Sequence, residues 1–318
     1  MSNKLYVSMY HYTRNIAKSR YPGIKGMSDV QFRAQIGYIN EKFNVVCMEQ
    51  VLDALNKKKS LPENALLLTF DDGYIDNYTC VFPILNEFKI SGCFFIPAKT
   101  FSTHELLDVN KIHYILACAE ESKLVQDIKA QMDFYRGQEF DYASTDELYF
   151  KYAVANRFDT KDTIFIKRML QTVLPERLRN IVSSNLFEKY VGVTEEQLAY
   201  ELYMSENQIS MMKRNGMHIG VHGYDHYWLG NLPVEQMKKD IDKAIDTMDG
   251  LIDIKQWSMN YPYGNYNQEV INYIKAKGAK IGFTTEVRVA DIELDSPFEI
   301  PRLDCNDFPP ISKRYMSI

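Results

Sequence analysis

Two adjacent carboxylates are the first candidates for chemistry in this chain. Asp71 and Asp72 follow the apolar run 65–68 and precede Gly73, so the sequence predicts that a buried strand ends there and a turn begins. Side chains alternate along a strand, but a turn at its end can bring neighbouring carboxylates toward one point. Two negative charges at one point repel each other unless a cation or an arginine compensates them. A metal ion is the natural compensator.

Two histidines with ligand-like spacing complete such a site. His222 and His226 are four residues apart and directly follow a second strand-like run, residues 218–221. One carboxylate and two imidazoles can hold a divalent ion with a position left open for water, which is a common hydrolytic arrangement. Asp72, His222 and His226 supply those ligands, and the adjacent Asp71 is then free to act as general base.

Each motif alone is weak evidence. An Asp-Asp-Gly sequence is often only a turn, and a lone His-x3-His pair is often not a metal site. Together, however, both motifs stand at the ends of predicted strands, where α/β folds build their sites. The combination therefore favours a functional site over the alternative that both motifs are only structural.

The elements that must position these residues alternate between strand and helix. Short apolar runs bounded by turn residues predict strands at 4–10, 43–47, 65–70, 92–96, 217–221, 256–260 and 279–284. Helical patterns lie between them, such as the one that opens with a capping box at Ser28 and Gln31. This order predicts an α/β fold with a parallel sheet, because crossover helices must connect parallel strands.

The middle of the chain has a different pattern. Between about His104 and Arg214 the strand signal fades, and apolar residues at helical spacing appear at 166–173 and 178–186. We therefore predict one β/α domain made of residues 1–103 and 210–318, with a helical insertion at 104–209. The insertion is expected either to cap the cleft or to make a dimer contact, and the sequence does not decide between them or establish an oligomeric state.

Composition excludes several classes of function. The 318 residues carry a net charge of −5 with no long basic block, which argues against nucleic-acid binding. No apolar run approaches the roughly 20 residues of a membrane span, and the first residues do not resemble a secretion signal, so we predict a soluble, cytoplasmic protein. Five scattered cysteines without a Cys-x-x-Cys pair indicate reduced thiols.

The motifs resemble those of a known family. Thr69-Phe-Asp-Asp-Gly73, His222-x3-His226 and Tyr261-Pro-Tyr-Gly264 occur in the order found in the polysaccharide deacetylase family, carbohydrate esterase family 4. The resemblance covers residues 1 to about 103 and 210 to 305. It implies a distorted (β/α)7 barrel and a metal-dependent enzyme that removes acetyl groups from sugars. It also implies that Asp71 is the catalytic base and that Asp72, His222 and His226 bind the metal, most simply Zn²⁺.

The chain departs from this family in two places. Many members have an arginine two residues before the proline of the third motif, where it pairs with the base, but here that residue is Asn260. Arg302 could reach Asp71 from another loop and replace that arginine, although a purely structural ion pair is an equal alternative.

The second departure concerns the general acid. The family's late Leu-x-His motif, the usual source of that acid, is missing, because no histidine follows His226. His11, at the end of the first predicted strand, is the candidate general acid, with a structural role as the alternative.

Substrate contacts are predicted around the third motif. Tyr261, Pro262 and Tyr263 would form a groove wall, because aromatic faces stack on sugar rings. An ordinary aromatic turn is the alternative. Asp304 offers a polar contact near Arg302.

The resulting hypothesis is a metal-dependent hydrolase that removes an N-acyl group, most simply acetyl, from an amino sugar. The expected substrate is a nucleotide-linked, lipid-linked or free sugar precursor of a surface polysaccharide such as lipopolysaccharide. Two alternatives stay open. One is a deformylase of an N-formylated sugar, since a small pocket discriminates a methyl group only modestly. The other is a sugar-binding protein that has lost turnover.

Overall fold

The computed structural model describes residues 3–318, which divide into two compact units. The first unit contains the chain up to Asn15, together with Gly26–His104 and Glu201–Ile318. The second contains Ile16–Lys25 and Glu105–Tyr200. All candidate site residues belong to the first unit.

The strands of the first unit form one mainly parallel sheet. Its strands are β1 (Lys4–Tyr10), β2 (Asn44–Val45), β3 (Ala65–Phe70), β4 (Cys93–Ile96), β5 (His218–Val221), β6 (Trp257–Asn260), β7 (Ala279–Phe283), β8 (Ala290–Asp291) and β9 (Leu303–Asp304). The order across the sheet is β7-β6-β5-β4-β3-β1-β8, with β2 paired to β3 and β9 to β1. Only β8 runs antiparallel to its neighbour among the described pairings. The predicted α/β class is confirmed, and the curved parallel sheet is that of a distorted, incompletely closed barrel.

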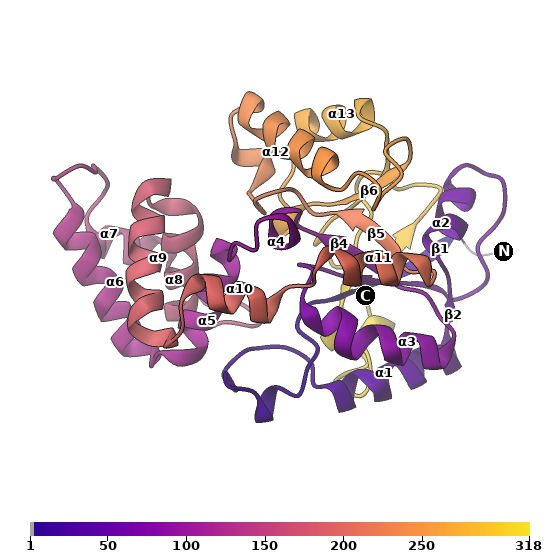
Figure 1. The fold of residues 1–318 in the computed structure, drawn as a ribbon, viewed down its shortest axis with the longest axis horizontal. Helices are drawn as coiled ribbons and strands as arrows, with labels where there is room; N and C mark the ends of the chain where they lie inside the picture. The colour runs from indigo at the N-terminus through magenta and orange to yellow at the C-terminus, as the bar shows by residue number, and fades with distance from the viewer. Residues whose placement is uncertain (1–2) are drawn as a thin grey trace. The chain divides into compact units, whose positions relative to one another are not determined.

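Helices connect successive strands and cover the sheet. They are α1 (Asp29–Lys42), α2 (Met48–Leu55), α3 (Phe82–Phe88), α4 (Lys99–Ser102), α11 (Glu206–Arg214), α12 (Val234–Thr247) and α13 (Gln268–Ala276). Figure 1 shows α1 and α3 on one side of the strands and α12 and α13 on the other. The predicted capping box is present at the start of α1, where Ser28 Oγ accepts the Gln31 N–H and the Gln31 side chain accepts the Ser28 N–H.

Alternation along the strands sorts their side chains into two apolar clusters. In β3, Leu66, Leu68 and Phe70 belong to the cluster that includes α1, α3, α11, α12 and α13, whereas Ala65 and Leu67 belong to a second cluster on the opposite face, which includes α2. β3 is thus buried on both faces, which explains its nearly continuous apolar sequence.

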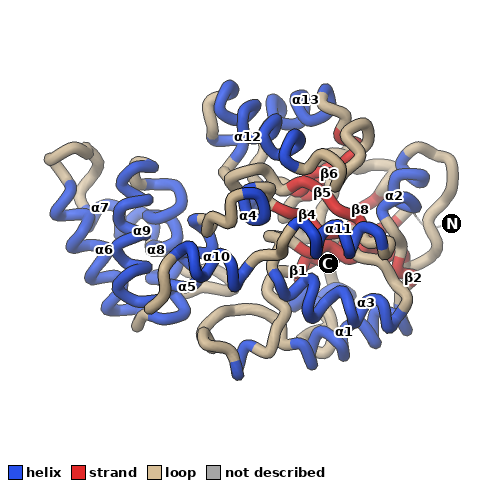
Figure 2. The backbone as a smooth tube through the Cα atoms, in the orientation of Figure 1, coloured by secondary structure: helices blue, strands red, loops and turns tan. Residues whose placement is uncertain are grey.

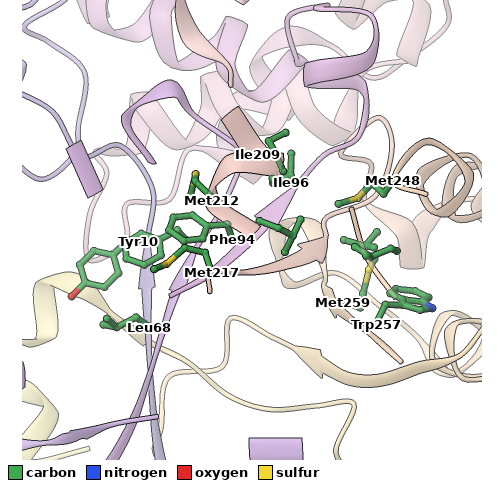
Figure 3. Close-up of a cluster of buried hydrophobic side chains, with 14 of the residues drawn as sticks. Tyr10, Leu68, Phe94, Ile96, Ile209, Met212, Met217, Met248, Trp257 and Met259 are labelled. Atoms are coloured by element: carbon green, nitrogen blue, oxygen red, sulfur yellow. The ribbon is translucent and has the colours of Figure 1, made fainter. Parts of the chain in front are cut away.

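Figure 3 shows the first of these clusters in detail. Phe94 and Met259 come from strands, whereas Ile209 and Met212 come from α11. All four side chains are fully buried. The helices are therefore held to the sheet mainly by apolar burial.

Three aromatic rings tie neighbouring strands together next to the candidate site. Phe70 of β3 lies opposite Tyr10 of β1 and Phe94 of β4 in the strand ladders. Its ring stacks on both neighbours, with centroid distances of 5.0 Å to Tyr10 and 4.8 Å to Phe94. Such pairs add about 0.5–1.5 kcal/mol each beyond their buried area. The stack stabilises the register of three strands one residue before Asp71.

The second unit is helical within its described residues (Figure 2). Its helices are α5 (Asp108–Cys118), α6 (Glu121–Tyr135), α7 (Thr145–Tyr152), α8 (Lys161–Arg168), α9 (Glu176–Val191) and α10 (Glu195–Leu202). The boundary between the units falls within α10, after Tyr200. Tyr21, from the short segment Ile16–Lys25, packs edge-on against Tyr114, and its hydroxyl donates to the Val191 carbonyl. The insertion's role as a cap or dimer contact stays a prediction.

The remaining short turns complete the chain. Five-residue π-helical turns occupy Asn77–Val81 and Met169–Val173, and 3-10 turns occupy Ile16–Lys18, Leu229–Asn231, Pro262–Gly264, Cys305–Asp307 and Arg314–Met316. Across residues 3–318, no helix has both the length and the apolar character needed to cross a membrane. All five cysteines are free thiols.

A histidine outside the candidate site makes the fold sensitive to acid. His218 begins β5, and its Nε2 lies 2.7 Å from Ser258 Oγ. Burial lowers the pKa of His218 to about 4. As the pH falls below about 6.5, the unfolded chain therefore takes up a proton at this residue before the folded protein does, and the folded state loses stability.

We expect His218→Gln to reduce this loss, because glutamine can still bond Ser258 but cannot be protonated. The variant should retain up to about 3 kcal/mol more of its neutral-pH stability near pH 4 than the wild type retains. Urea denaturation at neutral and acidic pH measures this difference. If the free energy of unfolding fell equally with pH in both proteins, His218 would not be the cause of the acid sensitivity.

Candidate active site

The candidate residues meet at one edge of the sheet. β1, β3 and β5 end at Tyr10, Phe70 and Val221. Their ladders run parallel through β4, so their carboxyl ends point the same way. The residues that follow these ends, His11, Asp71 and His222, are therefore brought to the same edge.

A tight turn separates the roles of the two adjacent carboxylates. Asp72 and Gly73 both have positive φ, at 72° and 68°. A Cβ at Gly73 would lie 2.8 Å from Ile96 Cγ2, so only glycine fits there. Aspartate tolerates the left-handed conformation better than most residues. The chain thus reverses sharply after Asp71, as the sequence predicts.

Asp72, His222 and His226 form a compact cluster of ligand atoms. Asp72 Oδ1 lies 3.5 Å from His222 Nε2 and 3.3 Å from His226 Nε2, and the two nitrogens are 3.2 Å apart. Ligands about 2.0–2.1 Å from a tetrahedral zinc ion are about 3.3 Å from one another. All three residues are buried. The arrangement therefore fits a divalent ion bound by one oxygen and two nitrogens.

Hydrogen bonds orient the ligands toward that point. His222 Nδ1 lies 2.7 Å from the Asn260 carbonyl, which can only accept, so Nδ1 carries the proton and Nε2 presents its lone pair to the cluster. Tyr74 donates its hydroxyl hydrogen to Asp72 Oδ2 at 2.6 Å. Asp72 Oδ1 is buried and accepts no hydrogen bond within residues 3–318. A bound cation would satisfy this oxygen.

The charge state of Asp72 suits a ligand. Burial by itself would raise the pKa of Asp72, but the His222 and His226 imidazoles outweigh burial and hold that pKa well below its usual range. Burial lowers the pKa of His226, which favours the neutral imidazole that metals bind.

Asp71 has a different partner. Arg302 Nη1 donates to Asp71 Oδ1 at 2.9 Å, and both side chains are almost completely buried. The guanidinium also donates from Nε to the Thr284 carbonyl at 2.9 Å and from Nη1 to Thr69 Oγ1 at 3.2 Å. Burial would raise the pKa of Asp71, but Arg302, assisted by nearby histidines, lowers it. The structure thus brings Arg302 to Asp71, while the catalytic role of the pair stays a prediction.

The side chain of Asn260, which stands at the family's arginine position, does not bond to Asp71. Its side chain is fully buried, and neither its amide oxygen nor its amide nitrogen has a hydrogen-bond partner in the described chain. Only its backbone carbonyl contributes, through the bond from His222.

His11 lies beside Asp71 and is accessible. Its Nε2 is 3.7 Å from Asp71 Oδ2, and its side chain is 42% exposed. The residues that follow fix its loop: Tyr12 stacks on Tyr74 with centroids 4.1 Å apart, and Asp76 Oδ2 accepts hydrogen bonds from the Thr13 backbone and from Arg14 Nε. A group that can carry a proton is thus held between the proposed base and solvent.

The third motif behaves differently from expectation. Tyr261 is fully buried, stacks on Tyr266 and donates its hydroxyl to the Phe298 carbonyl, so its ring is not available to a sugar. Pro262 is buried as well. This corrects the expected groove wall at Tyr261. The residue directly follows the fully buried strand β6, and its backbone N–H donates to the Phe283 carbonyl, so the chain is still packed inside the fold at this point.

Tyr263 is the residue of this motif that lies by the cluster. It is partly exposed, has a positive φ of 58°, and packs edge-on against His226 at 4.6 Å between centroids. Trp228 stacks on its ring at 4.5 Å and 12°. Sequence reasoning missed Trp228, although its position two residues after a ligand was a usable signal.

Asp304 stabilises the turn that follows it. Its Oδ1 accepts hydrogen bonds from the backbone and side chain of Asn306, which caps the short turn Cys305–Asp307. A contact with substrate stays a prediction.

Comparison with known proteins identifies relatives. A family model described as polysaccharide deacetylase matches residues 58–131 and 154–282, more than half of the chain. YxkH of Bacillus subtilis strain 168, a protein named for the same family, is 23% identical over 206 residues, which are 64% of each chain. The poly-beta-1,6-N-acetyl-D-glucosamine N-deacetylase of Escherichia coli K12 is 34% identical over 84 residues, 26% of this chain and 12% of that protein. The chain thus spans less than two thirds of either relative.

Two solved structures have the same fold. The Streptococcus pyogenes deacetylase PplD in complex with acetate has a TM-score of 0.60 at 15% identity, covering 99% of this chain and 96% of that one. IcaB from Ammonifex degensii has a TM-score of 0.58 at 19% identity, covering 99% and 95%. At these identities the likeness establishes the fold alone.

The ligand assignment leads to a prediction about metal binding. Asp72→Ala, His222→Ala and His226→Ala should each weaken zinc binding by at least about 100-fold, since loss of a ligand exceeds the effect of outer contacts. Asp71→Asn should bind zinc nearly as the wild type does. Elemental analysis and competition with a chromophoric chelator measure both. Equal zinc loss in all four variants would contradict the separation of roles.

The Asp71–Arg302 pair leads to a prediction about stability. Arg302→Met should lower the free energy of unfolding at neutral pH by roughly 3–5 kcal/mol, because it leaves a buried carboxylate uncompensated. The variant raises the pKa of Asp71, so this carboxyl protonates at higher pH and the difference from wild type should narrow as the pH falls.

Denaturation at several pH values tests this expectation. Lys277→Met is a matched control, because it removes a largely exposed ion pair with Asp242 and should cost below about 1 kcal/mol. If the Arg302 variant were as stable as this control, Arg302 would not compensate the buried Asp71 carboxylate, and the prediction would be wrong.

Proposed function

The chain belongs to the polysaccharide deacetylase family, and we propose that it is a metal-dependent hydrolase that removes an N-acyl group, most simply acetyl, from an amino sugar. The observation that carries this proposal is the convergence of Asp72, His222 and His226 on one point, with the Asp71–Arg302 pair beside it. Zinc is the proposed ion, because two neutral imidazoles and one carboxylate form a common catalytic zinc site.

The proposed chemistry divides the work between a bound ion and three side chains. A bound divalent ion would polarise the acyl carbonyl and lower the pKa of a water molecule. Asp71 takes the proton of the attacking water as the water oxygen bonds to the acyl carbon. Arg302 keeps Asp71 ionised for this step. His11, in its protonated form, gives a proton to the sugar nitrogen as the carbon–nitrogen bond breaks.

The surroundings of the cluster support a sugar substrate. The Tyr263–Trp228 stack offers partly exposed aromatic surface next to His226, and aromatic faces pack well against the apolar faces of sugar rings. The Escherichia coli relative is named for a β-1,6-linked polymer of N-acetylglucosamine. We therefore place such an oligomer first among candidate substrates, ahead of nucleotide-linked, lipid-linked or free precursors of surface glycans such as lipopolysaccharide.

The decisive experiment measures acid released from defined sugars. Zinc-loaded protein is incubated with β-1,6-linked N-acetylglucosamine oligomers, with a nucleotide-linked N-acetyl sugar, with a lipid-linked N-acetyl sugar and with N-formyl analogues. Acetate and formate are then quantified separately. Acetate release that stops on chelation supports the proposal, whereas formate alone would favour the deformylase. Sugar binding without any release would favour a non-catalytic protein.

The role of Asp71 can be tested in the same assay. Asp71→Asn should lower turnover by roughly 10²–10⁴-fold, the usual contribution of a general base, while zinc stays bound. Asp53→Asn, a partly exposed carboxylate on α2 that pairs with Lys58, is the matched control and should leave turnover unchanged. Near-normal turnover in Asp71→Asn would refute the proton transfer.

A further inference from the structure

The loop that carries both histidines has an irregular backbone. Residues His222–His226 join β5 to the segment before α12, and Gly223 and His226 have positive φ of 72° and 58°. Such a loop cannot satisfy its own amides and carbonyls by regular pairing, so other groups must bond them. Those groups determine where the imidazoles point.

A buried carboxylate on α12 bonds two consecutive amides of this loop. Asp240 Oδ2 accepts the Tyr224 N–H at 3.0 Å, and its Oδ1 accepts the Asp225 N–H at 2.9 Å. The residue is only 6% exposed. Gly223 allows this close approach, because a Cβ there would lie 3.0 Å from Asp240 Oδ2.

The opposite edge of the loop is fixed by α4. The Ala98 N–H donates to the Gly223 carbonyl at 3.0 Å, and the Lys99 N–H donates to the Tyr224 carbonyl at 3.2 Å. Lys99 Nζ also pairs with the Asp225 carboxylate at 2.8 Å. The amides of the segment between the two ligands are thus bonded on one side and its carbonyls on the other.

Keeping a carboxylate in this position has an energetic cost. Burial raises the pKa of Asp240 to about 6, although both amide bonds act in the opposite direction. Each oxygen of Asp240 accepts one hydrogen bond from the loop, and none of the three ligand residues, all described in the structure, bonds to Asp240. Helix packing alone would be served as well by an apolar residue.

We propose that Asp240 is a positioning residue that holds the His222–His226 loop in its metal-binding conformation, so that both Nε2 atoms converge before an ion arrives. The inference rests on the metal site of the proposed function. Outer contacts of this kind typically contribute about 10–100-fold to metal affinity. Asp240 touches neither imidazole and acts through the backbone between them.

The test compares isosteric substitutions on one helix. Asp240→Asn keeps the shape of the side chain but replaces one acceptor with a donor that faces an N–H. Asp242→Asn is the matched control, because Asp242 lies on the same helix and its partners are Tyr273 and Lys277. Zinc affinity is measured by chelator competition, and hydrogen exchange at the amides of Tyr224 and Asp225 is measured in the chelated protein.

We expect Asp240→Asn to bind zinc about 10–100-fold more weakly than wild type and to exchange both amides faster, with Asp242→Asn unchanged in both measurements. A merely structural role would lower the melting temperature but leave zinc affinity intact. Asp240→Asn with wild-type zinc affinity, or an equal loss in Asp242→Asn, would overturn the inference. If the wild type bound no divalent ion, the proposed function would fail and the inference with it.

A second variant tests the contact between Asp240 and the loop by changing the loop instead of Asp240. Gly223→Ala leaves Asp240 intact but places a methyl group against its Oδ2 and strains the loop. It should also weaken zinc binding by about 10-fold or more. If Asp240→Asn does not fold, this variant decides the question, and unchanged zinc affinity in it would overturn the inference.

Discussion

The register of the parallel strands is the constraint on which the site depends. His11, Asp71 and His222 each follow the last residue of a strand, and side chains alternate between the two faces of a sheet. A slip of one residue would send each side chain to the opposite face. The stacked rings of Tyr10, Phe70 and Phe94 oppose such a slip directly before the site. Apolar packing in the core thus sets the geometry of the polar edge.

Two neighbouring carboxylates are buried here, and each is compensated in its own way. Asp71 pairs with Arg302, whereas Asp72 faces two imidazoles that are suited to share an ion with it. Because the turn at Asp72 and Gly73 separates the two environments, one carboxylate can hold a cation while its neighbour stays available to a proton. The two neighbouring residues are therefore suited to the two different roles proposed for them.

The sequence correctly predicts the features of the fold and site that local patterns determine. Apolar runs predicted the strands, and the spacing of Asp72, His222 and His226 predicted a cluster that the structure brings together. Sequence reasoning failed where tertiary contacts decide, as for Tyr261, whose buried ring stacks on Tyr266 and whose hydroxyl donates to the Phe298 carbonyl. The sequence did not predict the role of Asp240. A carboxylate on an amphipathic helix is normally expected to face solvent, and only the fold shows that it bonds the His222–His226 loop. The segment Ile16–Lys25 lacks any periodicity that would have linked it to the second unit.

The arginine beside Asp71 comes from a distant part of the chain. Arg302 is 231 positions from its partner along the chain, whereas Asn260 directly precedes the third motif. A buried carboxylate needs a positive charge at one location in space, and a residue far along the chain can supply it. A motif that demands arginine at one fixed position therefore misses a chain that brings the charge from elsewhere.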